Sequence, residues 1–284
     1  MKTGFIGLGH LGKAMANRLT AEGVELVVWN RTREKAEGLG AEIASNPGEV
    51  ASRAEIIFLN LFDSKAVRTV LSGSNGILDA ECNGKVIVDT STNHFEDVLH
   101  FHEMLSERGA SYLEAPVLGS VVPASQGALT VLVSGQQAAY NKAFPFLEKI
   151  SRNIFYLERP ALATKMKLIN NLVLGAFMAT LAEAIAIAEA AGIEKEKAIE
   201  MLLAGAGNSG VLHAKKEKLL REDFSAQFSS SLIYKDLHYM QDLARDLKRP
   251  LFTGSVVKEL FGLTFGKKMD DLDFSAIYRV MKEL

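Results

Sequence analysis

The chain has 284 residues, which is enough for about two domains. Lysine and arginine together number 32, against 34 aspartate and glutamate residues, with no long run of one sign. This balance argues against a nucleic acid or a membrane surface as the partner. The single cysteine, Cys82, excludes an intrachain disulfide framework and, with no credible export signal, predicts a cytoplasmic protein.

Short β-rich runs alternate with helical spacing up to about residue 160. The runs expected to form strands are Thr3–Ile6, Glu25–Trp29, Glu55–Asn60, Lys85–Asp89, Ser111–Glu114, Leu129–Ser134 and Asn153–Leu157. Between them, Lys13–Glu22 and Arg33–Leu39 have helical spacing. Such alternation predicts βαβ units around a doubly wound, mainly parallel sheet, and hence an α/β domain over residues 1–162.

Helical patterns dominate the rest of the chain, which predicts an all-α domain over residues 163–284. Its segments include Lys195–Ala204, Ser229–Leu247 and Phe274–Leu284. The domain opens with a long apolar helix that begins near Ala163. Glu183 and Glu189 interrupt its apolar residues, so we expect a buried helix rather than a membrane span.

A glycine loop, Gly7-Leu8-Gly9-His10-Leu11-Gly12, follows the first strand and opens a helix. The first glycine permits a tight turn, the second lets the backbone approach a pyrophosphate, and the third lets helix and strand pack closely. The helix N-terminus attracts the anion. Since strand, helix and second strand are all in place, the loop predicts dinucleotide binding rather than an ordinary glycine-rich turn.

The second strand ends at Asn30-Arg31-Thr32, where an NAD-preferring site usually offers a carboxylate to the ribose 2′-hydroxyl. Arg31 can instead bind a 2′-phosphate, and Asn30 and Thr32 can add neutral hydrogen bonds. We therefore expect NADP to be preferred, with NAD possible. Leu61 and Phe62 follow the third strand and are candidates for an apolar wall against the cofactor, with plain core packing as the alternative.

Five segments occur in an order typical of one family: the glycine loop, Asn30–Thr32, Asp89–Thr92, Glu114–Ser120 and Lys167–Asn171. In these motifs the whole chain resembles the β-hydroxyacid dehydrogenase family, most closely its glyoxylate and succinic semialdehyde reductases. The resemblance implies a Rossmann domain, a long interdomain helix, a helical domain, and a homodimer or homotetramer. It also implies reversible NAD(P)-dependent oxidation of a small β-hydroxyacid, or reduction of a short aldehyde acid.

The resemblance also assigns residues. Lys167 matches the family's catalytic lysine and Asn171 the asparagine one turn later. Thr92 matches a threonine between cofactor and substrate, and Lys235 and Asp236 match a pair that closes over the nicotinamide.

Two positions depart from the family pattern. Leu118 stands where many relatives have a serine that helps to hold the substrate carboxylate. The backbone N–H groups of Gly119 and Ser120, with the Ser120 hydroxyl, can still bind an anion, so a less polar or differently placed substrate is plausible. Phe95 stands where relatives often have proline, which leaves the shape of the preceding loop open.

Reducing a carbonyl group requires a hydride and a proton donor. The positive end of a helix dipole and burial both disfavour an ammonium, so Lys167 is a candidate acid. Asn171 lies four residues later and shares its helix face, whereas Lys165 is turned away by roughly 200°. The alternative, a surface lysine near a helix end, fits less well because the helix continues with apolar residues on this face.

Other chemistries have weaker signals. The six histidines lack acidic or cysteine partners at ligand spacing, so no metal site is expected. An imine reductase-like activity is a rival: Lys167 argues against it, and Leu118 mildly favours it. A non-catalytic dinucleotide-binding module is a second rival, disfavoured because Lys167, Asn171, Lys235 and Asp236 are all retained.

Overall fold

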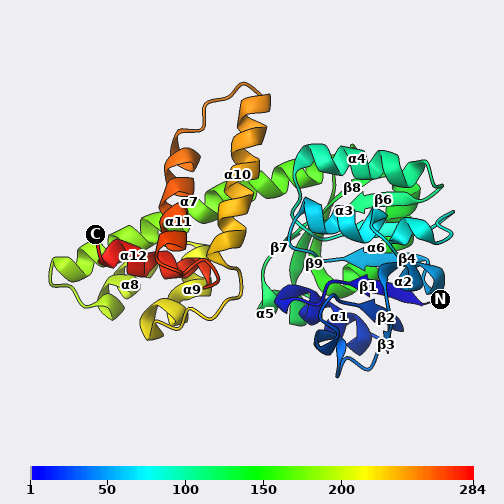
Figure 1. Cartoon of the computed structure of the whole chain (residues 1–284). Coiled ribbons are helices and arrows are strands. Elements are labelled where there is room, and N and C mark those ends of the chain that lie inside the picture. Colours follow the sequence, from blue (N-terminus) through cyan, green and yellow to red (C-terminus); the bar gives the residue numbers. More distant parts are fainter. Residues whose placement is uncertain (1) are drawn as a thin grey trace. The chain divides into compact units, whose positions relative to one another are not determined.

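The computed structural model describes residues 2–284, which form two compact units. The first unit ends at Lys167 and the second is Leu168–Leu284. The first is an α/β unit and the second is helical, as the sequence predicts (Figure 1). A single helix, α7 (Leu162–Ala190), contains the division point.

The first unit is built on a nine-stranded sheet. Its strands are β1 (Thr3–Ile6), β2 (Leu26–Trp29), β3 (Glu42–Ile43), β4 (Ile56–Leu59), β5 (Val86–Asp89), β6 (Ser111–Glu114), β7 (Val117–Leu118), β8 (Leu129–Gly135) and β9 (Ser151–Tyr156). The order is β3-β2-β1-β4-β5-β6-β8-β7, with β9 beside β8. Strands β1 to β6 run parallel, whereas β8 is antiparallel to both β6 and β7. The carboxyl ends of the parallel strands therefore meet at one edge.

Helices cover both faces of this sheet (Figure 1). They are α1 (His10–Ala21), η1 (Arg33–Ala36), α2 (Pro47–Arg53), α3 (Ser64–Ser72), η2 (Ile77–Asp79), α4 (Phe95–Ser106), α5 (Val121–Ser125) and α6 (Gln137–Ile150). Because strand side chains alternate between faces, Phe5 belongs to the core beneath α1 and α6. Its neighbour Ile6 belongs to the core beneath α2, α3 and α4.

Local details differ from the sequence reading at two places. Helical spacing over Arg33–Leu39 yields only the 3-10 turn Arg33–Ala36, because the backbone is extended at Glu37 and Gly38 has φ +77°. The two-residue strands β3 and β7 were not expected, since each is too short to show an alternating pattern.

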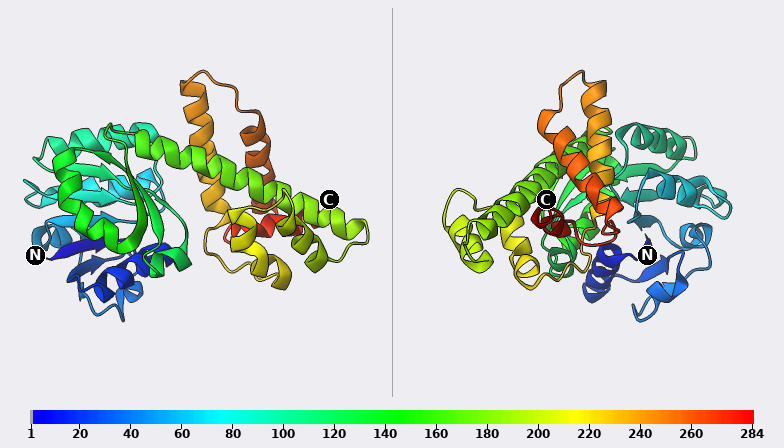
Figure 2. Two further views of the ribbon diagram at one scale, coloured as in Figure 1. Left: turned by 180° about the vertical axis from the view of Figure 1, so that it is seen from behind. Right: turned by 60° about the vertical axis from the view of Figure 1, so that its left-hand side comes forward.

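The second unit contains α8 (Lys195–Ala204), α9 (Gly210–Arg221), α10 (Ser230–Asp246), α11 (Phe252–Gly266), η3 (Phe274–Ala276) and α12 (Ile277–Lys282), together with most of α7. Helices α10 and α11 lie side by side (Figure 2). The core combines residues of α7 such as Met178, Ala182 and Ile185 with Phe261 of α11 and Tyr278 of α12.

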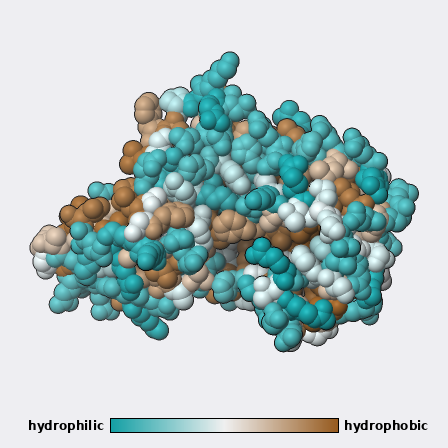
Figure 3. Space-filling view, in the orientation of Figure 1, coloured by the Kyte–Doolittle hydropathy of each residue, from teal (hydrophilic) through white to brown (hydrophobic). Residues whose placement is uncertain are grey.

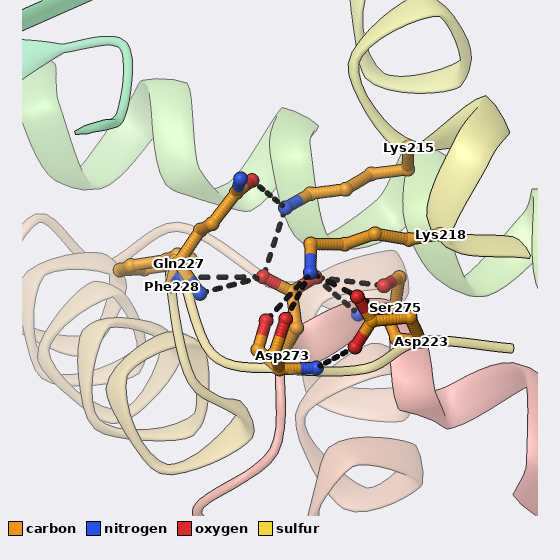
Figure 4. A network of polar contacts seen from close by, with 8 residues as sticks. Lys215, Lys218, Asp223, Gln227, Phe228, Asp273 and Ser275 are labelled. Carbon is orange, nitrogen blue, oxygen red and sulfur yellow. Dashed lines mark hydrogen bonds and ion pairs between the residues drawn. The ribbon is translucent and has the colours of Figure 1, made fainter. Parts of the chain in front are cut away.

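A buried ion pair holds the segments around η3 together (Figure 4). The Lys215 amine lies 2.9 Å from Asp273, and the same carboxylate accepts the backbone N–H groups of Gln227, Phe228 and Ser275. Burial lowers the pKa of Lys215, and the Asp273 charge opposes that shift. Lys215 lies within α9, Gln227 and Phe228 precede α10, and Ser275 belongs to η3, so this network joins three segments of the helical unit and is structural.

Helix α7 is, among residues 2–284, the one helix long and apolar enough to cross a membrane by length and composition. The core helices of soluble proteins meet the same criterion. Met178, Ala182 and Ile185 are fully buried in the helical core, which favours the expected packing role. The absence of a membrane partner stays a prediction.

Candidate functional site

Different constraints require glycine at the three positions Gly7, Gly9 and Gly12 of the loop. A Cβ on Gly7, whose φ is +96°, would lie 2.2 Å from the Asn60 carbonyl oxygen, and one on Gly12 would lie 2.1 Å from that of Gly7. A Cβ on Gly9 would meet nothing within 4 Å, at an ordinary φ of −65°. The fold requires the outer two glycines, whereas only a ligand that approaches the backbone requires Gly9.

The loop leaves the N-terminus of α1 open. Gly9 is its N-cap, no side chain caps the helix, and its first turn has no acidic residue. The free N–H groups and the positive end of the helix dipole favour an anion here. These features fit the pyrophosphate of a dinucleotide.

Asn30 shapes this loop. Its Oδ1 accepts the Leu8 N–H at 2.9 Å, while its Nδ2 donates to the Thr32 carbonyl at 2.8 Å. Arg31 and Thr32 are exposed at the end of β2. Asn30 therefore joins the ends of β1 and β2, a role that sequence reasoning missed because it considered only a ligand as its partner.

A cavity of about 630 Å³ lies beside the loop. Its lining residues come from the glycine loop, α1, η1 and α5: Leu8, Gly9, His10, Lys13, Ala14, Asn17, Arg18, Ala21, Lys35, Val121 and Ser125. The basic side chains Lys13, Arg18 and Lys35 were not singled out from the sequence. Lys35 lies four residues after Arg31 in the sequence, and this spacing was the signal that could have pointed to Lys35 as a second basic residue near the cofactor.

The ends of β4 and β5 are tied together. The Leu61 N–H donates to Ser91 Oγ at 2.8 Å, and Asn60 Nδ2 donates to Thr90 Oγ1 at 3.0 Å. Leu61 packs against the core, whereas Phe62 is 50 % exposed. The two candidates for an apolar wall thus differ, and Phe62 is the one that a ligand could cover.

A buried carboxylate shapes the loop that carries Thr92. Asp89 accepts hydrogen bonds from the Ser91 N–H at 2.8 Å, Asn93 Nδ2 at 2.8 Å and the Tyr112 hydroxyl at 2.6 Å. Burial raises the pKa of Asp89, although these hydrogen bonds oppose the rise. Residues on both sides of Thr92 are therefore fixed to the same carboxylate.

Lys167 is buried, with 8 % of its surface exposed. Its amine donates to the Val117 carbonyl at 2.8 Å, directly before Leu118, Gly119 and Ser120. Gly119 has φ +120°, and a Cβ there would lie 2.8 Å from a Leu129 methyl group. The first unit therefore brings Lys167 together with the predicted substrate loop.

The start of α7 differs from the sequence picture in one respect. A buried carboxylate, Glu114, accepts the N–H groups of Ala161 and Thr164. Its negative charge offsets the positive end of the helix dipole, which the sequence argument had counted, together with burial, as disfavouring an ammonium at Lys167. Lys165 instead places its amine 5.3 Å from the centre of the Phe95 ring.

The second unit joins three of the predicted residues. Asn171 Nδ2 donates to Asp236 Oδ2 at 2.6 Å, and the Lys235 amine lies 2.9 Å from Asp236 Oδ1. Asn171 and Asp236 are buried. The Lys235 amine also lies 4.9 Å from the centre of the Tyr239 ring. The bond to Asp236 sets the amide orientation of Asn171, which lies one turn after Lys167 on α7.

Two family models match the chain. Residues 2–157 match the NAD binding domain of 6-phosphogluconate dehydrogenase, and residues 162–281 match the NAD-binding domain of NADP-dependent 3-hydroxyisobutyrate dehydrogenase. A curated relative, glyoxylate/succinic semialdehyde reductase 2 of Arabidopsis thaliana, is 32% identical over 98% of this chain and 79% of its own length.

Solved structures agree. The crystal structure of a 3-hydroxyisobutyrate dehydrogenase from Salmonella typhimurium is 26% identical, with a TM-score of 0.92 over 99% of both chains. Psf3 in complex with NADP+ and 2-OPP is 28% identical, with a TM-score of 0.91 over 98% of this chain and 99% of its own. The predicted Rossmann fold and the NAD(P) cofactor are confirmed. The chain belongs to the β-hydroxyacid dehydrogenase family of NAD(P)-dependent oxidoreductases.

Proposed function

We propose that the enzyme reduces a short semialdehyde or glyoxylate, and oxidises the matching hydroxyacid in reverse, with Lys167 as the general acid and base. The observation that carries this proposal is the buried Lys167 amine, held against the Val117 carbonyl next to the Leu118–Ser120 loop. A proton donor beside a loop whose N–H groups can bind an anion suits a substrate with a carbonyl and a carboxylate close together.

The cofactor, when bound, supplies the hydride to the carbonyl carbon. Lys167 then protonates the developing alkoxide oxygen, and in the reverse direction its neutral amine takes the hydroxyl proton. The N–H groups of Gly119 and Ser120 hold the substrate carboxylate. Asn171, fixed by Asp236, orients the reacting oxygen one helical turn from Lys167.

We assign the cofactor contacts to the predicted residues. The loop from Gly7 to Gly12 holds the pyrophosphate at the open start of α1, and Leu61, Phe62 and Thr92 line its path. Lys235 and Asp236 act at the nicotinamide end. Exposed Arg31 and Thr32, with no carboxylate at position 30, favour NADP over NAD.

Leu118 affects which substrates the site can bind, because its side chain gives no hydrogen bond to a carboxylate. Oxidation of NADPH and of NADH is followed with glyoxylate, succinic semialdehyde, tartronate semialdehyde, methylmalonate semialdehyde and a cyclic imine. The reverse reaction is followed with 3-hydroxypropionate and serine. We expect NADPH-dependent turnover of an aldehyde acid. Turnover of the imine alone would establish the rival activity that Leu118 favours.

The role of Lys167 is tested by Lys167→Ala. Loss of the acid should lower kcat by about a hundredfold, while the Kd for NADPH, measured by fluorescence titration, stays nearly unchanged. Lys165→Ala is the matched control, since that amine faces the Phe95 ring, and it should keep wild-type kcat. Near-normal turnover of Lys167→Ala would refute this mechanism.

We also propose a cytoplasmic homodimer or homotetramer. In the second unit, Ile169, Val173 and Phe177 form an exposed apolar stripe on α7, and Phe252 and Val256 are exposed on α11. Figure 3 shows apolar surface over the start of α11 and over the second half of α7, the half in which Ile187 is also exposed. Burial of these residues by a second copy would remove them from water. Sedimentation velocity tests this, and a monomer at micromolar concentration would contradict it.

A further inference from the structure

The first turn of α7 has no free N–H group. In an isolated helix the first four N–H groups lack acceptors. Here Leu162 donates to the Arg159 carbonyl at 3.3 Å, and Ala163 donates to Ser134 Oγ at 2.9 Å. Thr164 donates to Glu114 Oε2 at 3.0 Å. Side chains from the ends of β6 and β8 therefore hold the helix start.

Glu114 is the central acceptor of this arrangement. Its side chain is 1 % exposed, and its two oxygens face the N–H groups of Ala161 and Thr164 and the ring of His102, whose Nε2 lies 3.2 Å from Oε1. A buried carboxylate is costly unless it is paired and hydrogen-bonded. Two backbone N–H donors at a helix N-terminus, with the His102 ring beside them, meet that requirement, so the position suits a charged cap.

The same short segment also holds Lys167. Val117 follows Glu114 by three residues, and its carbonyl accepts the Lys167 amine at 2.8 Å. The Glu114–Val117 segment thus contacts α7 at two points. The Glu114 carboxylate accepts backbone N–H groups at the helix start, and the Val117 carbonyl accepts the Lys167 amine about one turn later. The substrate loop continues directly from Val117, so any shift at Glu114 reaches both the loop and the amine.

We propose that Glu114 is a positioning residue for Lys167, with His102 holding the carboxylate in place. It fixes the start of α7 against the end of β6, and this sets the amine at reacting distance from a substrate carbonyl on the adjacent loop. The inference rests on the proposed catalytic role of Lys167. It adds a residue that touches neither the substrate nor the cofactor.

The test is a double-mutant cycle with Glu114→Gln, Lys167→Ala and the double variant. Glutamine keeps the size and one acceptor but removes the charge. We expect Glu114→Gln to lower kcat by about tenfold, with KM for NADPH within about twofold of wild type. The double variant should be no slower than Lys167→Ala, because a positioning residue has no effect once its target is absent. Exposed Glu103 on α4 offers the control Glu103→Gln, which should keep wild-type kcat.

The outcomes separate the two ideas. If the Glu114→Gln loss multiplies that of Lys167→Ala, or if Glu114→Gln keeps wild-type kcat, the positioning role is overturned. If Lys167→Ala itself turns over normally, the proposed mechanism fails instead. Should Glu114→Gln not fold, His102→Asn replaces it in the cycle. It removes one contact of the carboxylate and should lower kcat by about threefold. If the double variant His102→Asn with Lys167→Ala is no slower than Lys167→Ala, the inference is supported. If the two losses multiply, the inference is overturned.

Discussion

Two helices that start in the first unit, α1 and α7, begin in opposite ways. At α1 no side chain caps the first turn, its N-cap is Gly9, and a Cβ on that glycine would meet no atom within 4 Å. At α7 the first turn is filled by Glu114 and Ser134, both provided by the ends of strands. Both helices begin with N–H groups that have no acceptor within the helix, and with the positive end of a helix dipole. One start accepts an anion from outside, and the other contains an anion of its own.

This contrast shows how one physical requirement can serve binding or stability. An open helix start costs stability in the absence of a ligand, and the ligand supplies the missing acceptors. At a closed start the protein's own side chains accept these N–H groups when the chain folds, so a ligand has no unsatisfied N–H group left to bind. Substitutions that close α1 or open α7 should therefore have opposite effects on cofactor affinity and on the free energy of unfolding.

The largest effect is expected from closing α1 with Gly9→Asp. The new carboxylate can cap the helix and would repel a pyrophosphate, so the Kd for NADPH should rise by about a hundredfold or more. The free energy of unfolding without cofactor should stay the same or rise, because no atom lies within 4 Å of the new Cβ. Gly210→Asp, at the start of the already capped α9, is the control. Unchanged NADPH affinity in Gly9→Asp would place the pyrophosphate elsewhere.

A smaller effect is expected from partly opening α7 with Ser134→Ala. The Ala163 N–H would lose its acceptor, which should lower the free energy of unfolding by about 1 kcal/mol in urea titrations. NADPH affinity should not change. Exposed Ser106 at the end of α4 gives the control Ser106→Ala, which should leave stability unaltered. A change in affinity without a change in stability would reverse the assigned roles of the two helix starts.

The sequence predicted the α/β unit, the helical unit and the glycine loop, since each depends on periodicity or on residues close together in the chain. It did not predict that Asn30 binds Leu8, or that Glu114 caps α7 over a separation of 50 residues. Those contacts depend on which strands become neighbours, and a single sequence does not specify this. The motif containing Glu114 was noted, but as a substrate loop, because its acceptor role requires knowing where α7 begins.

The bond between Asn30 and Leu8 constrains how cofactor preference can evolve. An aspartate at position 30, the usual choice of an NAD-preferring site, would still accept the Leu8 N–H but could no longer donate to the Thr32 carbonyl. The exchange would thus alter the turn that presents Arg31. Coenzyme preference should therefore change more easily by substitution of the exposed Arg31 than by substitution of Asn30. The Asn30 side chain serves both cofactor recognition and the shape of the loop.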